Sequence, residues 1–201
     1  MIKLKDILLE SKAPSIFIPR RVEGSVFLDN MYFKQLPPGL LNDVHVIGDF
    51  YCSYNILTSL VGVPKSVSGD FNCSNNKLTS LVGVPKSVSG HFDCSNNYLT
   101  TLEGVPQNVE SVDCHNNNLT SLKGSPTSSV DGFDCSGNKL TSLVGAPQNV
   151  DNYFDCSYNN LTSLDGAPKT VGGDFYCEHN PVKFTEEQVR AVCDVKGDVI
   201  V

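Results

Sequence analysis

The sequence predicts a repeat solenoid, in which short coils stack along one axis and a short parallel β-sheet lines the concave face. Seven of the eight cysteines recur at intervals of 20 or 21 residues between positions 52 and 177. The pattern Φ-x-C-x-x-N-x-L-x-x-L-x-G-x-P, with Phe or Val at Φ, surrounds six of them and begins again at the seventh. Self-similarity at this period is typical of architectures in which each coil contacts only its neighbours. The period therefore indicates the fold class before any single motif is weighed.

Each repeat is expected to begin with a short strand that has one inward and one outward side. In Φ-x-C, the alternation of a strand places Phe71 and Cys73 inward and Asn72 outward. Identical positions of successive coils then lie about 4.8 Å apart across a parallel sheet. The inward column at Φ comprises Phe50, Phe71, Phe92, Val112, Phe133, Phe154 and Phe175.

The repeated cysteines are predicted to form a buried ladder of free thiols. They stand in single file with no C-x-x-C pair, and adjacent in-register parallel strands do not offer easy disulfide geometry. Apolar burial also makes a thiol inert as a nucleophile. Small buried hydrophobic side chains in a reducing compartment are the expected role. The ladder comprises Cys52, Cys73, Cys94, Cys114, Cys135, Cys156 and Cys177.

After the strand, each coil turns at an Asn and continues with two Leu residues whose side chains are expected to cover the core. It then returns through a Gly-x-Pro step. The Asn amide is expected to satisfy backbone groups of its own turn and of the neighbouring coil. The Gly-x-Pro step favours a mostly extended or irregular return leg over a long helix. The turn asparagines are Asn55, Asn76, Asn97, Asn117, Asn138, Asn159 and Asn180.

Both ends need caps, because terminal coils would otherwise expose apolar faces. Thr185 and Gln188 form a capping box that predicts a capping helix to about Cys193, with Val189 and Val192 against the last coil. The last four residues are expected to add a short strand at the sheet edge. The chain thus divides into an N-terminal tag and linker (1–25), a degenerate capping repeat (26–50), the repeats (51–180) and a C-terminal cap (181–201).

Charge and composition exclude several functions. The net charge is −7, and residues 1–25 carry five basic and three acidic side chains, or +2, which leaves −9 for the remainder. An acidic body argues against nucleic acid or an anionic membrane surface as partner, and no run approaches the roughly 18 apolar residues of a membrane span. The four histidines occupy unrelated repeat positions, and no acidic residue recurs at ligand spacing from them. We therefore expect no enzymatic activity, no metal and no cofactor.

The outward residue of Φ-x-C is the candidate partner-binding position. Its four stacked carboxylates repel one another by about 0.8 kcal/mol per pair in water at ~5 Å, which does not help folding. One interpretation is a solvated polar face that drifted as repeats duplicated. The other is a binding surface for a basic partner, with Tyr side chains as anchors. The column comprises Tyr51, Asn72, Asp93, Asp113, Asp134, Asp155 and Tyr176.

The repeat resembles the leucine-rich repeat, L-x-x-L-x-L-x-x-N-x-L, with Phe and Cys in the two strand-core positions. The F-D-C-S-x-N-x-L-T-S-L-x-G-x-P rhythm and the closing T-E-E-Q-V-R-A-V-C segment resemble leucine-rich-repeat proteins of large tailed bacteriophages. The start, M-I-K-L-K-D-I-L-L-E-S, looks like the capsid-targeting peptides of such phages, which are cut after Leu/Ile-x-Glu. That resemblance implies processing at Leu8, Glu10 and Ser11; a disposable helical start is the alternative.

These observations lead to one functional hypothesis and two rivals. The hypothesis is a non-enzymatic, monomeric protein-binding scaffold of a phage, cytoplasmic in the bacterial host or packaged in the virion. Its partner would be a protein with a basic surface. The rivals are a structural virion component and a divalent-cation-dependent adhesin that uses the Asp column.

Overall fold

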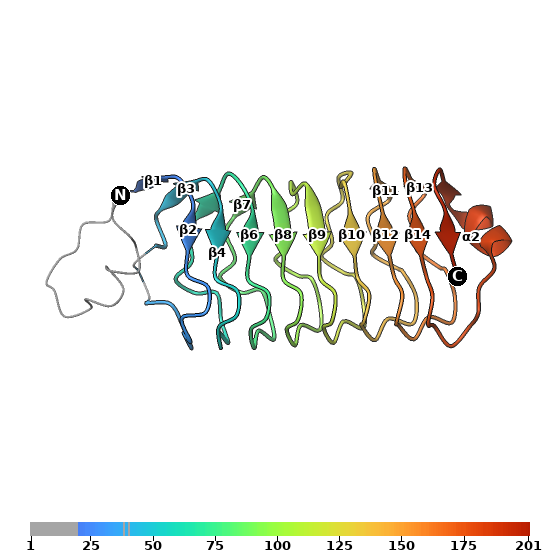
Figure 1. Ribbon diagram of the computed structural model, residues 1–201, viewed down its shortest axis with the longest axis horizontal. Helices are drawn as coiled ribbons and strands as arrows, with labels where there is room; N and C mark the ends of the chain where they lie inside the picture. The colour runs from blue at the N-terminus through green and yellow to red at the C-terminus, as the bar shows by residue number, and fades with distance from the viewer. Residues whose placement is uncertain (1–19, 38, 40) are drawn as a thin grey trace, which may run out of the picture.

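The computed structural model describes residues 20–37, 39 and 41–201. Its coils stack one after another along the long axis, and α2 (Glu186–Val192) lies at the C-terminal end (Figure 1). The predicted solenoid is confirmed. The predicted processing residues Leu8, Glu10 and Ser11 lie outside the described residues.

One side of the rod is a nine-stranded parallel sheet to which each successive coil adds one strand (Figure 1). The pairing is in register, so that Phe50, Phe71 and Phe92 are direct partners. The sheet comprises β2 (Val26–Phe27), β4 (Phe50–Tyr51), β6 (Phe71–Asn72), β8 (His91–Asp93), β9 (Ser111–Asp113), β10 (Phe133–Asp134), β12 (Phe154–Asp155), β14 (Phe175–Tyr176) and β16 (Val199–Ile200).

The inward side of this sheet carries the Phe and Cys columns. Ring centroids lie 5.7 Å apart between Phe50 and Phe71 and 5.6 Å apart between Phe71 and Phe92. Both columns are at most 3% exposed from Phe50 to Cys177. Full burial of one Phe contributes about 1.5–3 kcal/mol, so the Phe column is a main source of hydrophobic stabilisation.

All eight cysteines are free and buried. Burial raises the pKa of each thiol, to about 11 at Cys177 and Cys193 near the C-terminal end. The Sγ of Cys114 donates to the carbonyl oxygen of Asp134 in the next coil at 3.1 Å. The thiols therefore fill core volume and also add weak hydrogen bonds between coils.

The return leg is more regular than the sequence analysis expected, because part of it forms further parallel sheets. Valine recurs three or four residues after the repeat proline, and its buried side chain packs behind the first sheet. These strands form two groups, β1 (Arg21–Glu23), β3 (His45–Ile47), β5 (Ser66–Val67) and β7 (Ser87–Val88), then β11 (Asn149–Val150), β13 (Thr170–Val171) and β15 (Asp194–Val195). An isolated parallel bridge joins Val130 to Val150, which belongs to the first strand of the second group.

The turn asparagines bind both neighbouring coils, as predicted. In the coil of Asn159, its Nδ2 donates to the carbonyl oxygens of Cys156 and Ser157 at 3.2 and 3.1 Å and to that of Cys135, one coil earlier, at 3.0 Å. Its Oδ1 accepts from the backbone N–H of Leu140 at 3.0 Å. Equivalent contacts recur from Asn55 to Asn180. One amide thus closes a turn and fastens it to the preceding coil.

The ends differ from the sequence analysis in two details. Residues 21–23, placed there in the linker, form β1 and pair with β3. The capping box of Thr185 and Gln188 is present, but Val192 is 51% exposed. Cys193, the C-cap residue with extended backbone that follows the helix, is buried in its place. Among the described residues, no helix has the length and apolar character that a membrane crossing requires.

Asn159→Ala should lower the free energy of unfolding by about 2–4 kcal/mol. The substitution leaves the buried N–H of Leu140 and the carbonyl groups bound by the amide without hydrogen-bond partners. Asn160→Ala is the matched control, since this neighbouring side chain is exposed. Urea unfolding of both variants measures the difference. Equal losses would show that the ladder contributes little.

Cys114→Ser should cost about 1–2 kcal/mol, because the hydroxyl keeps a donor toward the Asp134 carbonyl while apolar volume is lost. The native chain should react slowly with a thiol reagent, and the unfolded chain should report eight thiols. Any disulfide-linked peptide found by mass spectrometry would contradict the ladder of free thiols.

Candidate binding surface

The outward side of the nine-stranded sheet, called the outer face below, carries two columns of side chains. The second column is the one that the sequence analysis chose, and the strand register aligns all its members. Phe27 of β2 and Ile200 of β16 extend it at the two ends. Each residue predicted for this column is half-buried: Tyr51, Asn72, Asp93, Asp113, Asp134, Asp155 and Tyr176.

The first column consists of the residues immediately before Φ, which sequence reasoning overlooked. Strand alternation was the available signal, because residues on either side of a buried Phe share the outward side. Coils with Asp in the second column have a non-acidic residue in the first column, and coils with Asp in the first column have a non-acidic residue in the second. Eight consecutive coils therefore give one carboxylate each: Asp49, Asp70, Asp93, Asp113, Asp134, Asp155, Asp174 and Asp198.

The carboxylates of the second column also serve the fold, which corrects the view that they do not help folding. Oδ1 of Asp93 accepts from the backbone N–H of Ser95 at 2.9 Å and from its hydroxyl at 2.7 Å. Asn72 makes the same pair of contacts to Ser74 at 2.9 and 2.8 Å. Capping of the strand end thus needs an oxygen acceptor, whereas the negative charge is not required.

Carboxylates of the first column tie one coil to the next. Oδ1 of Asp49 accepts from the backbone N–H of Asp70 at 2.9 Å, and Oδ1 of Asp70 accepts from that of His91 at 2.8 Å. A Cβ at Gly69 would lie 2.1 Å from Oδ1 of Asp49, so the approach requires glycine there. These aspartates have a structural role besides their charge.

Burial makes the centre of the outer face costly for negative charge. It raises the pKa of Asp134 and of Asp155, and the neighbouring carboxylates contribute less to these shifts. The Tyr153 ring covers Gly132, where a Cβ would lie 2.5 Å from the ring. Burial, followed by the charges of nearby aspartates, raises the Tyr153 pKa to about 12. The raised pKa values thus fall on Asp134 and Asp155, and burial is the main cause at both.

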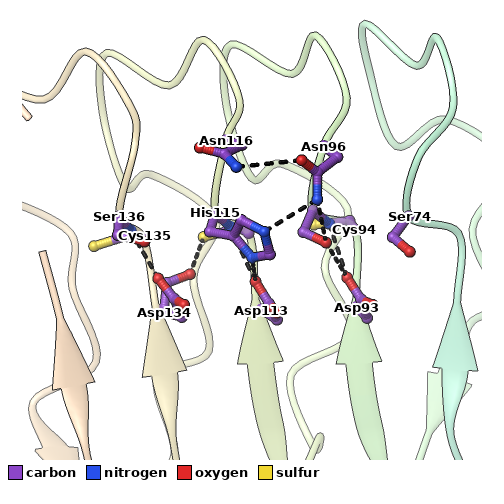
Figure 2. A network of polar contacts seen from close by, with 12 residues as sticks. Ser74, Asp93, Cys94, Asn96, Asp113, His115, Asn116, Asp134, Cys135 and Ser136 are labelled. Carbon is purple, nitrogen blue, oxygen red and sulfur yellow. Dashed lines mark hydrogen bonds and ion pairs between the residues drawn. The ribbon is translucent and has the colours of Figure 1, made fainter. Parts of the chain in front are cut away.

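His115 lies at the middle of the outer face beside Asp113, at a position where five other coils have Ser (Figure 2). Its Nδ1 lies 2.6 Å from Oδ1 of Asp113, and its Nε2 lies 3.0 Å from Nδ2 of Asn96. Asn96 uses its Oδ1 to accept from Asn116 at 3.2 Å, so its amide nitrogen faces the ring. With the amide nitrogen facing the ring, Nε2 accepts from Asn96 and Nδ1 donates to Asp113.

The same cluster offers metal-ligating atoms that the sequence analysis did not anticipate. One ligand atom each from Asp113, His115 and Asp134 lies within 4.8 Å of the other two. Carboxylate and imidazole are common ligands of divalent metals. Both ring nitrogens already have hydrogen-bond partners, so a cation would have to displace one of them.

Aromatic side chains stand at both ends of the outer face, in part on strained backbone. Tyr54, Tyr158 and His179 have φ values of 51°, 54° and 56°, and Asn75, Asn96, Asn116 and Gly137 occupy the equivalent positions. This left-handed conformation suits Gly and Asn but costs other residues about 1–2 kcal/mol. Three coils therefore keep a bulky ring where the backbone favours a small or amide side chain.

These features define the fold of a leucine-rich repeat protein. A similar solved structure is that of YopM, a leucine-rich effector protein from Yersinia pestis, with a TM-score of 0.63 and 23% sequence identity. That likeness covers 87% of this chain and 53% of the other, so the chain spans about half the length of the solved protein. A second match, YopM from Yersinia enterocolitica WA-314, has a TM-score of 0.38, 18% identity and coverages of 89% and 54%. No family model and no curated protein matches the sequence.

Asp155→Asn should raise stability at neutral pH and leave it unchanged in acid. Because the folded pKa of Asp155 is raised, its ionised form is disfavoured in the native state. The loss of stability caused by the ionised carboxylate grows as the pH rises from the pKa of the unfolded state through that of the folded state. An Asn side chain cannot ionise, so it removes this loss, and its amide oxygen can still accept from the backbone N–H of Ser157. Thermal unfolding between about pH 3 and pH 7 measures the effect. Asp131→Asn removes an exposed carboxylate as control; equal gains in both variants would exclude burial as the cause.

Proposed function

We propose that the chain is a non-enzymatic protein-binding scaffold whose outer face docks a partner with a basic surface. The observation that carries this proposal is the single carboxylate that each of eight consecutive coils adds to one face. The two outward columns contain no Lys or Arg. At about 4.8 Å per coil, the carboxylates form a strip roughly 34 Å long. Such a field attracts a cationic partner and accelerates association.

Several properties favour a protein as the partner. Tyr51 and Tyr176 stand in the same column as the aspartates, and Tyr is enriched in protein interfaces. Repeat solenoids present long continuous surfaces of this kind to other proteins. The negative strip repels nucleic acid and anionic lipid head groups. We propose that the scaffold acts as a monomer and needs no cofactor.

A second candidate function, cation-dependent adhesion, is favoured by the cluster of Asp113, His115 and Asp134. A chelator would abolish partner binding if a divalent ion bridged the two proteins. His115→Ser would have the same effect, although Ser stands at the equivalent position in five other coils. Binding that survives both treatments would leave direct charge pairing as the mechanism.

The double variant Asp113→Asn with Asp155→Asn tests the acidic face. Asn72 donates from Nδ2 to Oδ2 of Asp93 at 2.8 Å, so an Asn beside an Asp is already accommodated in this column. The variant should keep its fold and bind a lysine-rich peptide about tenfold more weakly, chiefly through a slower on-rate and with a flatter salt dependence. Surface plasmon resonance at low and high salt measures both. Unchanged affinity and salt dependence would refute the acidic face as the docking site.

We propose a phage setting on the resemblance of the first eleven residues to capsid-targeting peptides. Chain recovered from mature particles should then begin at Ser11, because the peptide would be removed during maturation. N-terminal mass spectrometry of purified particles makes this measurement. Particle-associated chain that begins at Met1 would contradict packaging by this route, and a stoichiometric copy number would favour a structural virion component.

A further inference from the structure

The N-terminal end of the outer face combines stacked rings with a carboxylate. Phe27 and Tyr51 stack with ring centroids 5.2 Å apart and an interplanar angle of 4°. Phe27 is 63% exposed although it belongs to a strand of the sheet. The hydroxyl of Tyr51 lies 3.5 Å from Oδ2 of Asp70 in the first column. An exposed aromatic surface therefore lies directly beside a negative charge.

The C-terminal end repeats this arrangement with different residues. Tyr158 and His179 stack with centroids 4.2 Å apart, and Tyr158 is 59% exposed. The hydroxyl of Tyr176 donates to Oδ2 of Asp174 at 3.2 Å. The half-buried carboxylate of Asp155 belongs to the same coil as Tyr158. Both ends of the acidic strip thus offer ring faces next to carboxylates.

The fold itself does not call for these rings. Tyr54 and Tyr158 occupy one repeat position at opposite ends, both in the left-handed conformation and both more than half exposed. Asn96 and Asn116 fill that position in the middle of the chain, with the same backbone conformation. A bulky side chain that is strained and exposed adds nothing to the core, and such strain is typical of functional sites.

A ring face beside a carboxylate suits a guanidinium group better than an ammonium group. Arginine stacks flat on an aromatic ring while its nitrogen atoms donate in pairs to a carboxylate. The lysine ammonium is a compact, strongly hydrated charge that pairs with carboxylates but cannot stack in this way. We propose that the aromatic ends of the outer face dock arginine side chains, so that the partner is arginine-rich. This proposal rests on the proposed function of the acidic face and specifies the chemistry of its partner.

Two peptides of equal length and charge test the proposal at low ionic strength, one of alternating arginine and glycine and one of alternating lysine and glycine. The native chain should bind the arginine peptide about five- to tenfold more tightly, as expected for two exposed cation–π contacts. Tyr54→Asn combined with Tyr158→Asn should reduce this ratio to about two- to threefold, because the Phe27–Tyr51 stack is left in place, with little change in the affinity for the lysine peptide. Because Asn occurs naturally at this position, the melting temperature should stay the same or rise.

Tyr98→Asn is the matched control. Tyr98 is 53% exposed and lies two residues further along its coil than the position of Tyr54 and Tyr158, and Asn118 and Asn160 stand at its position in other coils. It should leave the arginine-to-lysine ratio unchanged. The arginine proposal alone would be overturned if the native chain bound both peptides with equal affinity. It would also be overturned if the double Tyr variant kept the full arginine-to-lysine affinity ratio of the native chain. The acidic face would be refuted as well if the double variant Asp113→Asn with Asp155→Asn bound both peptides as tightly as the native chain does. It would also be refuted if the native chain bound neither peptide.

Discussion

The side-chain amide at the turn of each coil is the interaction on which the rest of the structure depends. Asn159 closes its own turn through the carbonyl of Cys156 and holds the preceding coil through the carbonyl of Cys135 and the N–H of Leu140. All of these groups are buried, so each would carry a desolvation cost if it lost its partner. Repetition of this contact keeps every coil at one spacing and in one register. The inner columns of Phe and Cys and the outer columns of acids follow from that register.

A fixed register also explains how the outer face tolerates its charge. In the second column, one carboxylate oxygen of an aspartate such as Asp93 accepts a backbone hydrogen bond that caps its own strand. In the first column, one carboxylate oxygen of an aspartate such as Asp49 accepts a backbone hydrogen bond from the next coil. Backbone N–H donors partly offset the repulsion along the strip. A cost remains at Asp134 and Asp155, where burial raises the pKa of the carboxyl group. Asn72 performs the same capping without a charge, so the fold does not account for the choice of Asp in four successive coils.

The aromatic side chains at the two ends of the strip, like the charges, are not explained by the needs of the fold. Most coils place Asn or Gly at the left-handed turn position, as the backbone favours, whereas Tyr54, Tyr158 and His179 do not. Charge and rings are thus placed on one face at the expense of stability, which natural proteins do mainly at functional sites. The leucine-rich fold supplies a rigid backing for this face, because the strands rest on a core that is almost fully buried.

The sequence by itself determined the solenoid, the inward columns, the asparagine ladder and the second outward column, because one period with strand alternation decides which residues share a side. The tertiary structure decided which segments of the return leg pair as strands and which unlike repeat positions come into contact. Strand pairing in the return leg arises only once the recurring valines of stacked coils come together. His115 meets Asp113 and Asp134 because its side-chain rotamer carries the ring from one repeat position to another. A repeat pattern aligns like with like, and contacts between unlike positions are set by three-dimensional packing.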